Sequence, residues 1–185
     1  MPTFDPDDTY SADAATLYHI RDLLAEVAAF QELCEVADKT AALTKIVYGL
    51  PSTPMGDYYT AEELETVFCE AHVHPPFEPQ SMAVLDEASP TAITGGMFEL
   101  DIRRHARKSE IATDDLRANL YLWFYDCVQG IAASLIEAYA TRACPRITRI
   151  ERTVEAAWGS YEERPTQSDY LWARLQLHWG DLEFE

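Results

Sequence analysis

A long apolar periodicity between Thr113 and Tyr139 constrains the fold of this chain more than any other feature. Apolar side chains recur there at steps of three and four residues, which is the spacing of one face of an α-helix. They are Leu116, Leu120, Trp123, Phe124, Cys127, Val128, Ile131, Leu135, Ile136 and Tyr139. Thr113 is suited to the N-cap, with Asp114 and Asp115 near the positive end of the helix dipole. A helix of roughly 40 Å, at about 1.5 Å per residue, needs a broad apolar partner surface.

The segment before this helix has the alternating pattern of a strand. Between Met97 and Arg103, apolar residues alternate with charged ones, so that Phe98, Leu100 and Ile102 share one face. A short strand is also expected in MAVLDEA, residues 82–88. Together these two segments predict a hairpin that precedes the long helix.

Two further strands are expected after the helix. Residues 146–157 are rich in Ile, Thr and Val, and residues 170–179 alternate between apolar and polar side chains. Two hairpins joined by a helix predict a β-β-α-β-β core over residues 81–180. The predicted fold class is α+β, with the long helix packed on an antiparallel sheet of about four strands.

The first part of the chain is expected to be mainly helical. Residues 1–10 are acidic and contain two prolines, which predicts a flexible arm before a single domain over residues 11–185. Within residues 11–76, helical spacing or capping predicts three N-terminal helices. They are expected over Ala12–Ala28, Thr40–Tyr48 and Thr60–His72, with further apolar spacing after a break near Ala28-Ala29.

The chain is strongly acidic, with a formal net charge of −18. Residues 1–100 have 3 Lys or Arg against 18 Asp or Glu, whereas residues 101–185 have 11 against 14. Such a protein repels nucleic acid and anionic membranes in general, which favours a basic or apolar partner. Solubility alone explains the charge equally well. No apolar run is long enough to span a bilayer.

The chain has no motif that is typical of a catalytic site. Cys69, His72 and His74 are the nearest approach to a metal cluster, but no second ligand group follows at zinc-finger spacing. Ser134 and Ser168 lie in no nucleophile elbow, and phosphate-binding glycine motifs are absent from the sequence. The four cysteines are expected to be buried free thiols. We therefore expect no enzyme activity, no metal and no cofactor.

Two groups of basic residues interrupt the acidic composition. One consists of Arg103, Arg104, Arg107 and Lys108, and the other of Arg146, Arg149 and Arg152. If their strands are neighbours, they form a positive band. This band can contact nucleic acid, meet the acidic half of a neighbouring copy, or be a solvated edge. The overall charge favours contact with a neighbouring copy over nucleic acid, and head-to-tail contacts of this kind generate rings.

The order of these elements resembles that of bacteriophage tail terminators and the related tail-completion proteins of the neck. The resemblance is carried by the first helix, GGMFELDIRRHARK, the long helix, RITRIERTVEAAW and YLWARLQLHW. The insert over residues 39–74 is longer than the compact family pattern, and its role stays open.

The resemblance implies a structural virion protein without enzymatic activity, made in the host cytoplasm. Such proteins form a homohexameric ring that caps the tail tube and faces the head-side connector. DNA passes through the lumen without specific binding, and no membrane is involved. By position, the Arg103–Lys108 loop and the group of Arg146, Arg149 and Arg152 are expected to contribute to ring or tube contacts.

Two other functions remain open at this point. The first is an acidic adaptor or inhibitor that binds a basic protein. The second is a small metal-dependent enzyme that uses the Cys69–His74 region.

Overall fold

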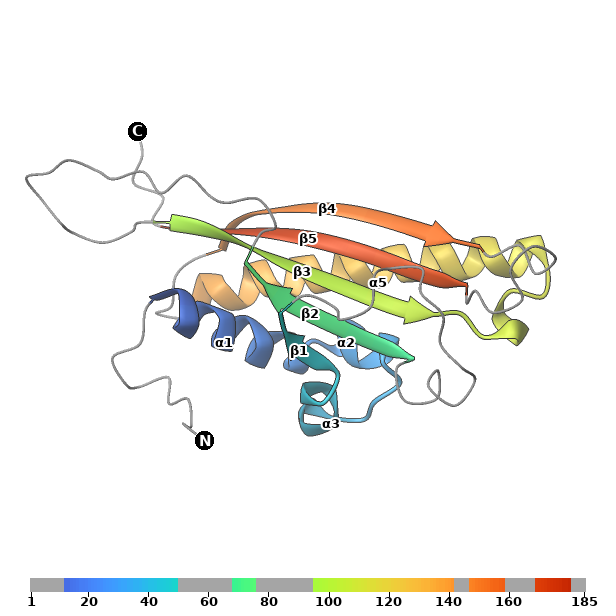
Figure 1. Ribbon diagram of the computed structural model, residues 1–185, viewed down its shortest axis with the longest axis horizontal. Coiled ribbons are helices and arrows are strands. Elements are labelled where there is room, and N and C mark those ends of the chain that lie inside the picture. The colour runs from blue at the N-terminus through green and yellow to red at the C-terminus, as the bar shows by residue number, and fades with distance from the viewer. Residues whose placement is uncertain (1–11, 50–67, 76–94, 142–146, 159–168, 181–185) are drawn as a thin grey trace, which may run out of the picture.

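The computed structural model describes residues 12–49, 68–75, 95–141, 147–158 and 169–180. These residues form one sheet with helices packed on one of its faces (Figure 1). In chain order the elements are α1 (Ala12–Glu26), α2 (Ala28–Leu33), α3 (Lys39–Leu43), β1 (Ile46–Tyr48), β2 (Cys69–His74), β3 (Gly95–His105), the short 3-10 helix η1 (Lys108–Glu110), α5 (Asp114–Thr141), β4 (Ile147–Ala157) and β5 (Tyr170–Gly180).

The sheet has five strands in the order β1-β2-β3-β5-β4. All neighbouring strands are antiparallel except β1 and β2, which are parallel. The α+β class and the mostly antiparallel sheet are confirmed, with one strand more than expected. β3 is central and pairs with β5 along its full length, from Gly95 opposite Gly180 to His105 opposite Tyr170.

Helix α5 begins where the capping pattern predicts. The backbone N–H of Leu116 donates to Oγ1 of Thr113 at 3.2 Å, which satisfies one of the free donors of the first turn. From Leu120 to Leu135 the predicted apolar face is mostly buried. Leu116 and Ile136, which share the apolar spacing, are exposed because they lie at the sides of this face, beyond its contact with the other layers.

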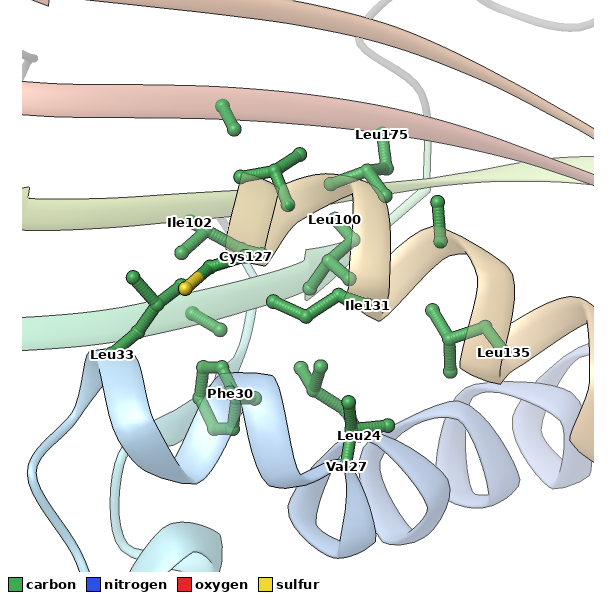
Figure 2. Close-up of a cluster of buried hydrophobic side chains, with 14 of the residues drawn as sticks. Leu24, Val27, Phe30, Leu33, Leu100, Ile102, Cys127, Ile131, Leu135 and Leu175 are labelled. Atoms are coloured by element: carbon green, nitrogen blue, oxygen red, sulfur yellow. The ribbon is translucent and has the colours of Figure 1, made fainter. Parts of the chain in front are cut away.

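The core lies between the sheet and the three longer helices (Figure 2). Leu24 and Phe30 come from α1 and α2, Ile131 from α5, and Leu100 and Leu175 from β3 and β5; all five are fully buried. Burying a side chain of this size stabilises the fold by about 1.5–3 kcal/mol. Gly130 of α5 leaves room for the close approach of Ala29, because a Cβ at Gly130 would lie 3.4 Å from that side chain.

Two predicted helices are wrong in their C-terminal parts. The helix expected over Thr60–His72 lies outside the described residues up to residue 67, but Cys69–His74 is strand β2. The helix expected over Thr40–Tyr48 ends at Leu43, and Ile46–Tyr48 forms β1. Both segments pair with each other, and this non-local pairing overrides local helical preference.

The hairpin expected before the long helix also differs. Residues 82–88 lie outside the described residues, and the place beside β3 over Glu99–Arg104 is occupied by β2. The first helix breaks at Val27, one residue before the expected position. None of the helices that the structure describes combines the length and the apolar composition needed to cross a membrane.

Candidate interaction surfaces

The basic residues at the end of β3 are mostly internal. Arg103 and Arg104 are 4% and 1% exposed and point to opposite faces of the sheet. Arg103 donates a hydrogen bond to Glu70 of β2. Arg104 donates to both carboxylate oxygens of Glu110, at 2.6 and 3.3 Å. Neither guanidinium is therefore on the surface that a neighbouring molecule would contact.

Arg104 lies on the helical side of the sheet between two aromatic rings. Its guanidinium carbon is 4.6 Å from the ring centre of Phe68 and 4.9 Å from that of Trp123. Burial raises the pKa of Glu110, but the hydrogen bonds from Arg104 and the Arg107 backbone, with the charges of both arginines, together lower it to a net value below the ordinary one. This arrangement anchors η1 and the start of α5 to the sheet.

The exposed part of this basic group connects η1 with α2. Arg107 donates to both carboxylate oxygens of Glu35, at 2.9 and 2.6 Å, and Lys108 is exposed on η1. Glu35 has φ +53°, an uncommon backbone conformation for a residue other than glycine. It ends α2 with hydrogen bonds typical of a Schellman motif, including Val36 N–H to Gln31 O at 3.0 Å.

The second basic group is not adjacent to the first. β5 lies between β3 and β4, and Arg103 pairs with Trp172 whereas Arg149 lies opposite His178. Arg103 is thus near the start of β5, Arg149 near its end and Arg152, opposite Leu175, at its middle, and the described residues form no continuous positive band. Arg146 lies outside the described residues.

Arg149 and Arg152 are exposed on the edge strand β4. Arg149 forms an ion pair with Glu151 at 2.7 Å. Arg152, on the helical side, donates to the hydroxyl of Tyr125 at 3.0 Å and lies 5.1 Å from the centre of its ring. Of the predicted interface residues that the structure describes, four are exposed: Arg107, Lys108, Arg149 and Arg152.

The three candidate metal ligands, Cys69, His72 and His74, do not share one face of β2. Successive side chains of β2 point to opposite faces, so Cys69 faces the helices whereas His72 and His74 face away. Burial raises the pKa of the Cys69 thiol well above its ordinary value, which disfavours a thiolate. Across the described part of the chain, no group of three or more His, Cys, Asp or Glu could hold a metal ion.

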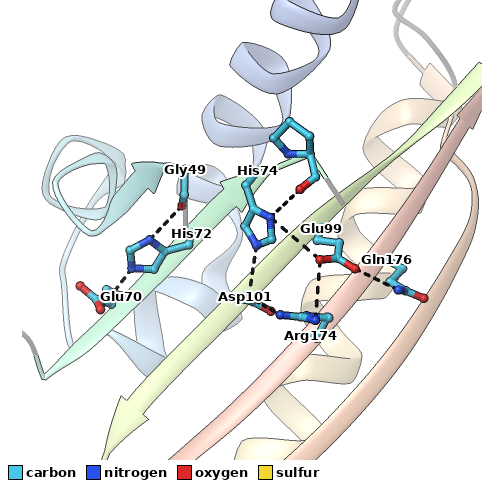
Figure 3. Close-up of polar contacts among 9 residues, drawn as sticks. Gly49, Glu70, His72, His74, Glu99, Asp101, Arg174 and Gln176 are labelled. Atoms are coloured by element: carbon cyan, nitrogen blue, oxygen red, sulfur yellow. Dashed lines mark hydrogen bonds and ion pairs between the residues drawn. The ribbon is translucent and has the colours of Figure 1, made fainter. Parts of the chain in front are cut away.

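The face of the sheet turned away from the helices has a charged cluster, defined here as His74, Glu99, Asp101, Arg174 and Gln176 (Figure 3). His74, Glu99 and Asp101 are buried, and Arg174 and Gln176 are half-buried. Asp101 accepts two hydrogen bonds from Arg174, at 2.8 and 2.9 Å, and lies 3.2 Å from Nε2 of His74. Gln176 donates to Glu99 at 3.0 Å. The cluster therefore links β2, β3 and β5 through side chains.

Both ring nitrogens of His74 face acceptors. Nδ1 lies 2.7 Å from the carbonyl oxygen of Pro75, and Nε2 faces Asp101. Burial lowers the pKa of His74. The hydrogen bonds to Asp101 and Pro75 and the charges of Asp101 and Glu99 together raise it by more, so the net pKa is raised. Burial likewise raises the pKa of Asp101, but Arg174 and His74 lower it to a net value below the ordinary one.

A second group of polar contacts, made by His72, lies on the same face near β1. Nδ1 of His72 lies 3.1 Å from the carbonyl oxygen of Gly49, and its Nε2 is 3.2 Å from Glu70 (Figure 3). Gly49 has φ +96°, a conformation that favours glycine, and it follows directly after β1. With His74 charged, the cations His74, Arg103 and Arg174 balance the carboxylates of Glu70, Glu99 and Asp101.

Sequence reasoning missed this cluster because alternation alone predicts a solvated polar face. Glu99, Asp101 and Arg103 were expected to point away from the apolar side, and they do, but all three are buried. The sequence does show acidic residues on one predicted strand and basic residues on another. Only the register between the strands shows that these residues are partners.

Apolar side chains are exposed at the two opposite edges of the sheet. At the first edge, Val47 and Tyr48 of β1 are 44% and 47% exposed. At the other edge, a groove of about 440 Å³ runs between α5 and β4. The groove is lined by Gln129, Ala132, Ala133, Ile136, Glu137, Ile150 and Arg152.

No protein-family model matches the chain, and no curated protein matches it in sequence.

Proposed function

We propose that this chain is a structural subunit of a tailed bacteriophage, a tail terminator that assembles as a ring on the end of the tail tube. The proposal rests on the resemblance in element order and on the α+β architecture. Its neighbours would be further copies of itself, the tail tube protein and the head-side connector. It would act in the tail or neck of the virion by contact alone, without a bond-making step.

The observation that carries this proposal is the exposure of apolar side chains at both edges of one sheet. Val47 and Tyr48 are exposed at β1, and Ile136 borders the groove at β4. β1 and β4 lie at opposite ends of the sheet order. Two unlike surfaces on opposite sides of a subunit are what a head-to-tail contact requires, and such contacts form closed rings when the rotation between copies closes.

The charge supports the same function. A net charge of −18 per copy would give a ring that repels DNA, so that DNA can pass through a lumen without being held. This repulsion would weaken at high ionic strength, since screening shortens its range.

The test is the mass of the full-length chain in solution and on its partner. Light scattering across a concentration series is expected to approach six times 20.9 kDa, about 125 kDa, with ring-shaped particles in electron micrographs. Addition of preformed tail tubes tests the capping step, which is expected to place one ring at a tube end. A chain that stays monomeric both alone and with tubes would contradict the proposal.

The acidic adaptor remains a second candidate because 18 acidic residues stand against 3 basic ones in residues 1–100. It predicts a monomer or dimer that binds a basic protein with an affinity that falls steeply with salt. The same light-scattering series, repeated with a basic protein added, distinguishes it from a ring. The metal-dependent alternative finds no support among the described residues, since Cys69 and the two histidines of β2 face opposite sides of the sheet.

A further inference from the structure

We infer that copies of this chain join edge to edge, with β1 of one copy pairing antiparallel with β4 of the next and Tyr48 entering the groove between α5 and β4. The inference rests on the proposed ring and specifies its contact. The occupant of the groove is thus a second copy of the chain.

Both edge strands have backbone groups available for pairing. β1 is hydrogen-bonded to β2 on one side and β4 to β5 on one side, and neither has a second partner among the described strands. An edge strand of eleven residues such as β4 presents a row of donors and acceptors that can accept another strand. Pairing β1 with β4 would match the three residues of β1 to part of the β4 edge. It would compete with Nε of Arg21 for the carbonyl oxygen of Ile46, which already accepts that hydrogen bond at 3.4 Å.

The strand directions agree with this pairing. β2 and β3 are antiparallel, as are β3 and β5 and then β5 and β4, so β4 runs opposite to β2. β1 runs parallel to β2 and therefore also opposite to β4. A rotation about an axis along the strands preserves these directions, so the β1 of the next copy in a ring would meet β4 as an antiparallel strand.

The faces of the sheet also agree. Tyr48 lies in register with Val73 of the helix-facing side, and Val47 lies in register with His72 on the opposite side. The groove lies on the helix-facing side, where Ile150 and Arg152 project from β4 toward α5. A sheet continued from one copy to the next would therefore carry the Tyr48 ring over the groove and not to the other face.

The groove has the chemistry to hold a tyrosine. Ala132, Ala133 and Ile136 provide an apolar floor, and the Arg152 guanidinium already lies over the ring of Tyr125. Within its own copy, Tyr48 already lies against a guanidinium, because Arg21 is 5.5 Å from its ring centre. Contact between arginine and an aromatic face contributes roughly 0.5–1 kcal/mol at an exposed site.

The charges at the two edges do not oppose the contact. Residues 12–49, which include β1 and the helices beside it, contain six acidic and three basic side chains. On β4, Arg149 and Arg152 are balanced by Glu151 and Glu155, and Arg149 is already paired with Glu151 at 2.7 Å. The acidic edge of one copy therefore meets an edge without net charge, whereas two acidic edges would repel each other.

Disulfide cross-linking tests the contact directly. We would prepare two variants, Val47→Cys with Thr153→Cys, and Val47→Cys with Glu151→Cys, which correspond to the two antiparallel registers that place Tyr48 opposite Arg152 or Ile150. Within one copy these positions are four strand spacings apart, about 19 Å at ~4.8 Å each. A disulfide requires Cα atoms about 4.4–6.8 Å apart, so it can form only between copies.

Mild oxidation of one of the two variants is expected to give a ladder of covalent oligomers that ends at the closed ring. The matched control is Val47→Cys with Val154→Cys, whose second cysteine faces the other side of the sheet. The control and the parent chain, which retains its native cysteines, are expected to show the same low background.

Each outcome decides between the contact and the ring. Oligomers by light scattering without a ladder in either variant would overturn the edge pairing and leave the ring standing. A ladder that stops at a dimer would overturn the head-to-tail arrangement. A chain that is monomeric by light scattering and gives no ladder would overturn both.

A second measurement does not depend on cysteine geometry. Tyr48→Ser is expected to raise the dissociation constant between copies at least tenfold, because it removes the side chain that fills the groove. Leu116→Ser is the control, since Leu116 is also exposed but lines a different hollow between α2 and α5. Equal effects of the two substitutions, with both chains folded by circular dichroism, would contradict the contact.

Discussion

His74 of β2 and Asp101 of β3 lie on neighbouring strands and on the same face of the sheet, with Nε2 of the imidazole 3.2 Å from Oδ2 of the carboxylate. The side chain of His74 is 1% exposed, and Asp101 also accepts two hydrogen bonds from Arg174 of β5. Because a buried carboxylate is stable only when it is paired, the two partners of Asp101 link side chains of three neighbouring strands, and the contribution of His74 depends on its charge.

The first prediction concerns the pH dependence of stability at His74. Its pKa is raised in the folded state, so its contribution is fully present below the ordinary value of 6.5 and is lost as the pH rises through the folded value. The free energy of unfolding of the wild type is expected to fall over this range, whereas His74→Gln is expected to remove that slope. Urea denaturation at a series of pH values measures this slope of the free energy of unfolding against pH. An unchanged slope in His74→Gln would contradict the charged histidine.

The second prediction is an opposite pH effect at His105. Burial and the charge of Arg103 lower the pKa of His105 from 6.5 to about 4. This histidine is neutral when folded, so stability is lost as the pH falls from about 6.5 toward 4. At about 1.4 kcal/mol per pKa unit, the loss amounts to about 3 kcal/mol. His105→Gln is expected to flatten the acid side of the same urea series and leave the alkaline side unchanged, which separates it from His74→Gln.

The third prediction concerns the backbone of Glu35. Its φ of +53° favours glycine, and its carboxylate holds the exposed Arg107. Glu35→Ala loses this ion pair and keeps the strain, whereas Glu35→Gly loses the pair and relieves the strain. Glu35→Gly is therefore expected to be more stable than Glu35→Ala by about 1 kcal/mol. Thermal unfolding of the two variants is the measurement, and equal stabilities would mean that the strain is not stored there.

The fourth prediction concerns the ion pair of Arg104 and Glu110. Arg104→Ala leaves Glu110 without its main partner and opens a space between Phe68 and Trp123, which is expected to cost about 3–5 kcal/mol. Arg104→Lys is expected to recover only part of this loss, because an ammonium cannot make the two-pronged contact with the carboxylate.

Chemical denaturation followed by tryptophan fluorescence measures both variants, since Trp123 contacts the substituted side chain. Glu35→Gln serves as the control, because Glu35 lies 3.9 Å from Arg104 but is exposed. Its effect is expected to stay below about 1 kcal/mol. A loss in Arg104→Ala no larger than in this control would contradict the role of the pair of Arg104 and Glu110.

The fifth prediction compares two leucines of α5. Leu135 is fully buried against the core, whereas Leu122 is 64% exposed. Leu135→Ala is expected to destabilise the protein by about 2–5 kcal/mol, and Leu122→Ala by at most about 0.5 kcal/mol. Urea denaturation of both variants checks the order, and a reversed order would show that α5 faces the sheet with a different side.

Part of the interface prediction could not have been made correctly from sequence. Arg103 and Arg104 are adjacent in a basic run, which is typical of a solvated loop. In the structure they project from opposite faces of β3 and each has an internal carboxylate partner, Glu70 or Glu110. Glu70 is 33 residues away from Arg103, so only the strand register brings the two together.

The long helix, strands β3, β4 and β5 and the α+β class followed from local spacing. An apolar period of three and four residues, or of two, is a property of neighbouring residues, and Thr113 caps its helix through an atom three residues away. The strands β1 and β2 and the buried charged face were decided by tertiary structure. Their side chains are stabilised by partners far along the chain, and the free energy of such contacts depends on which strands become neighbours.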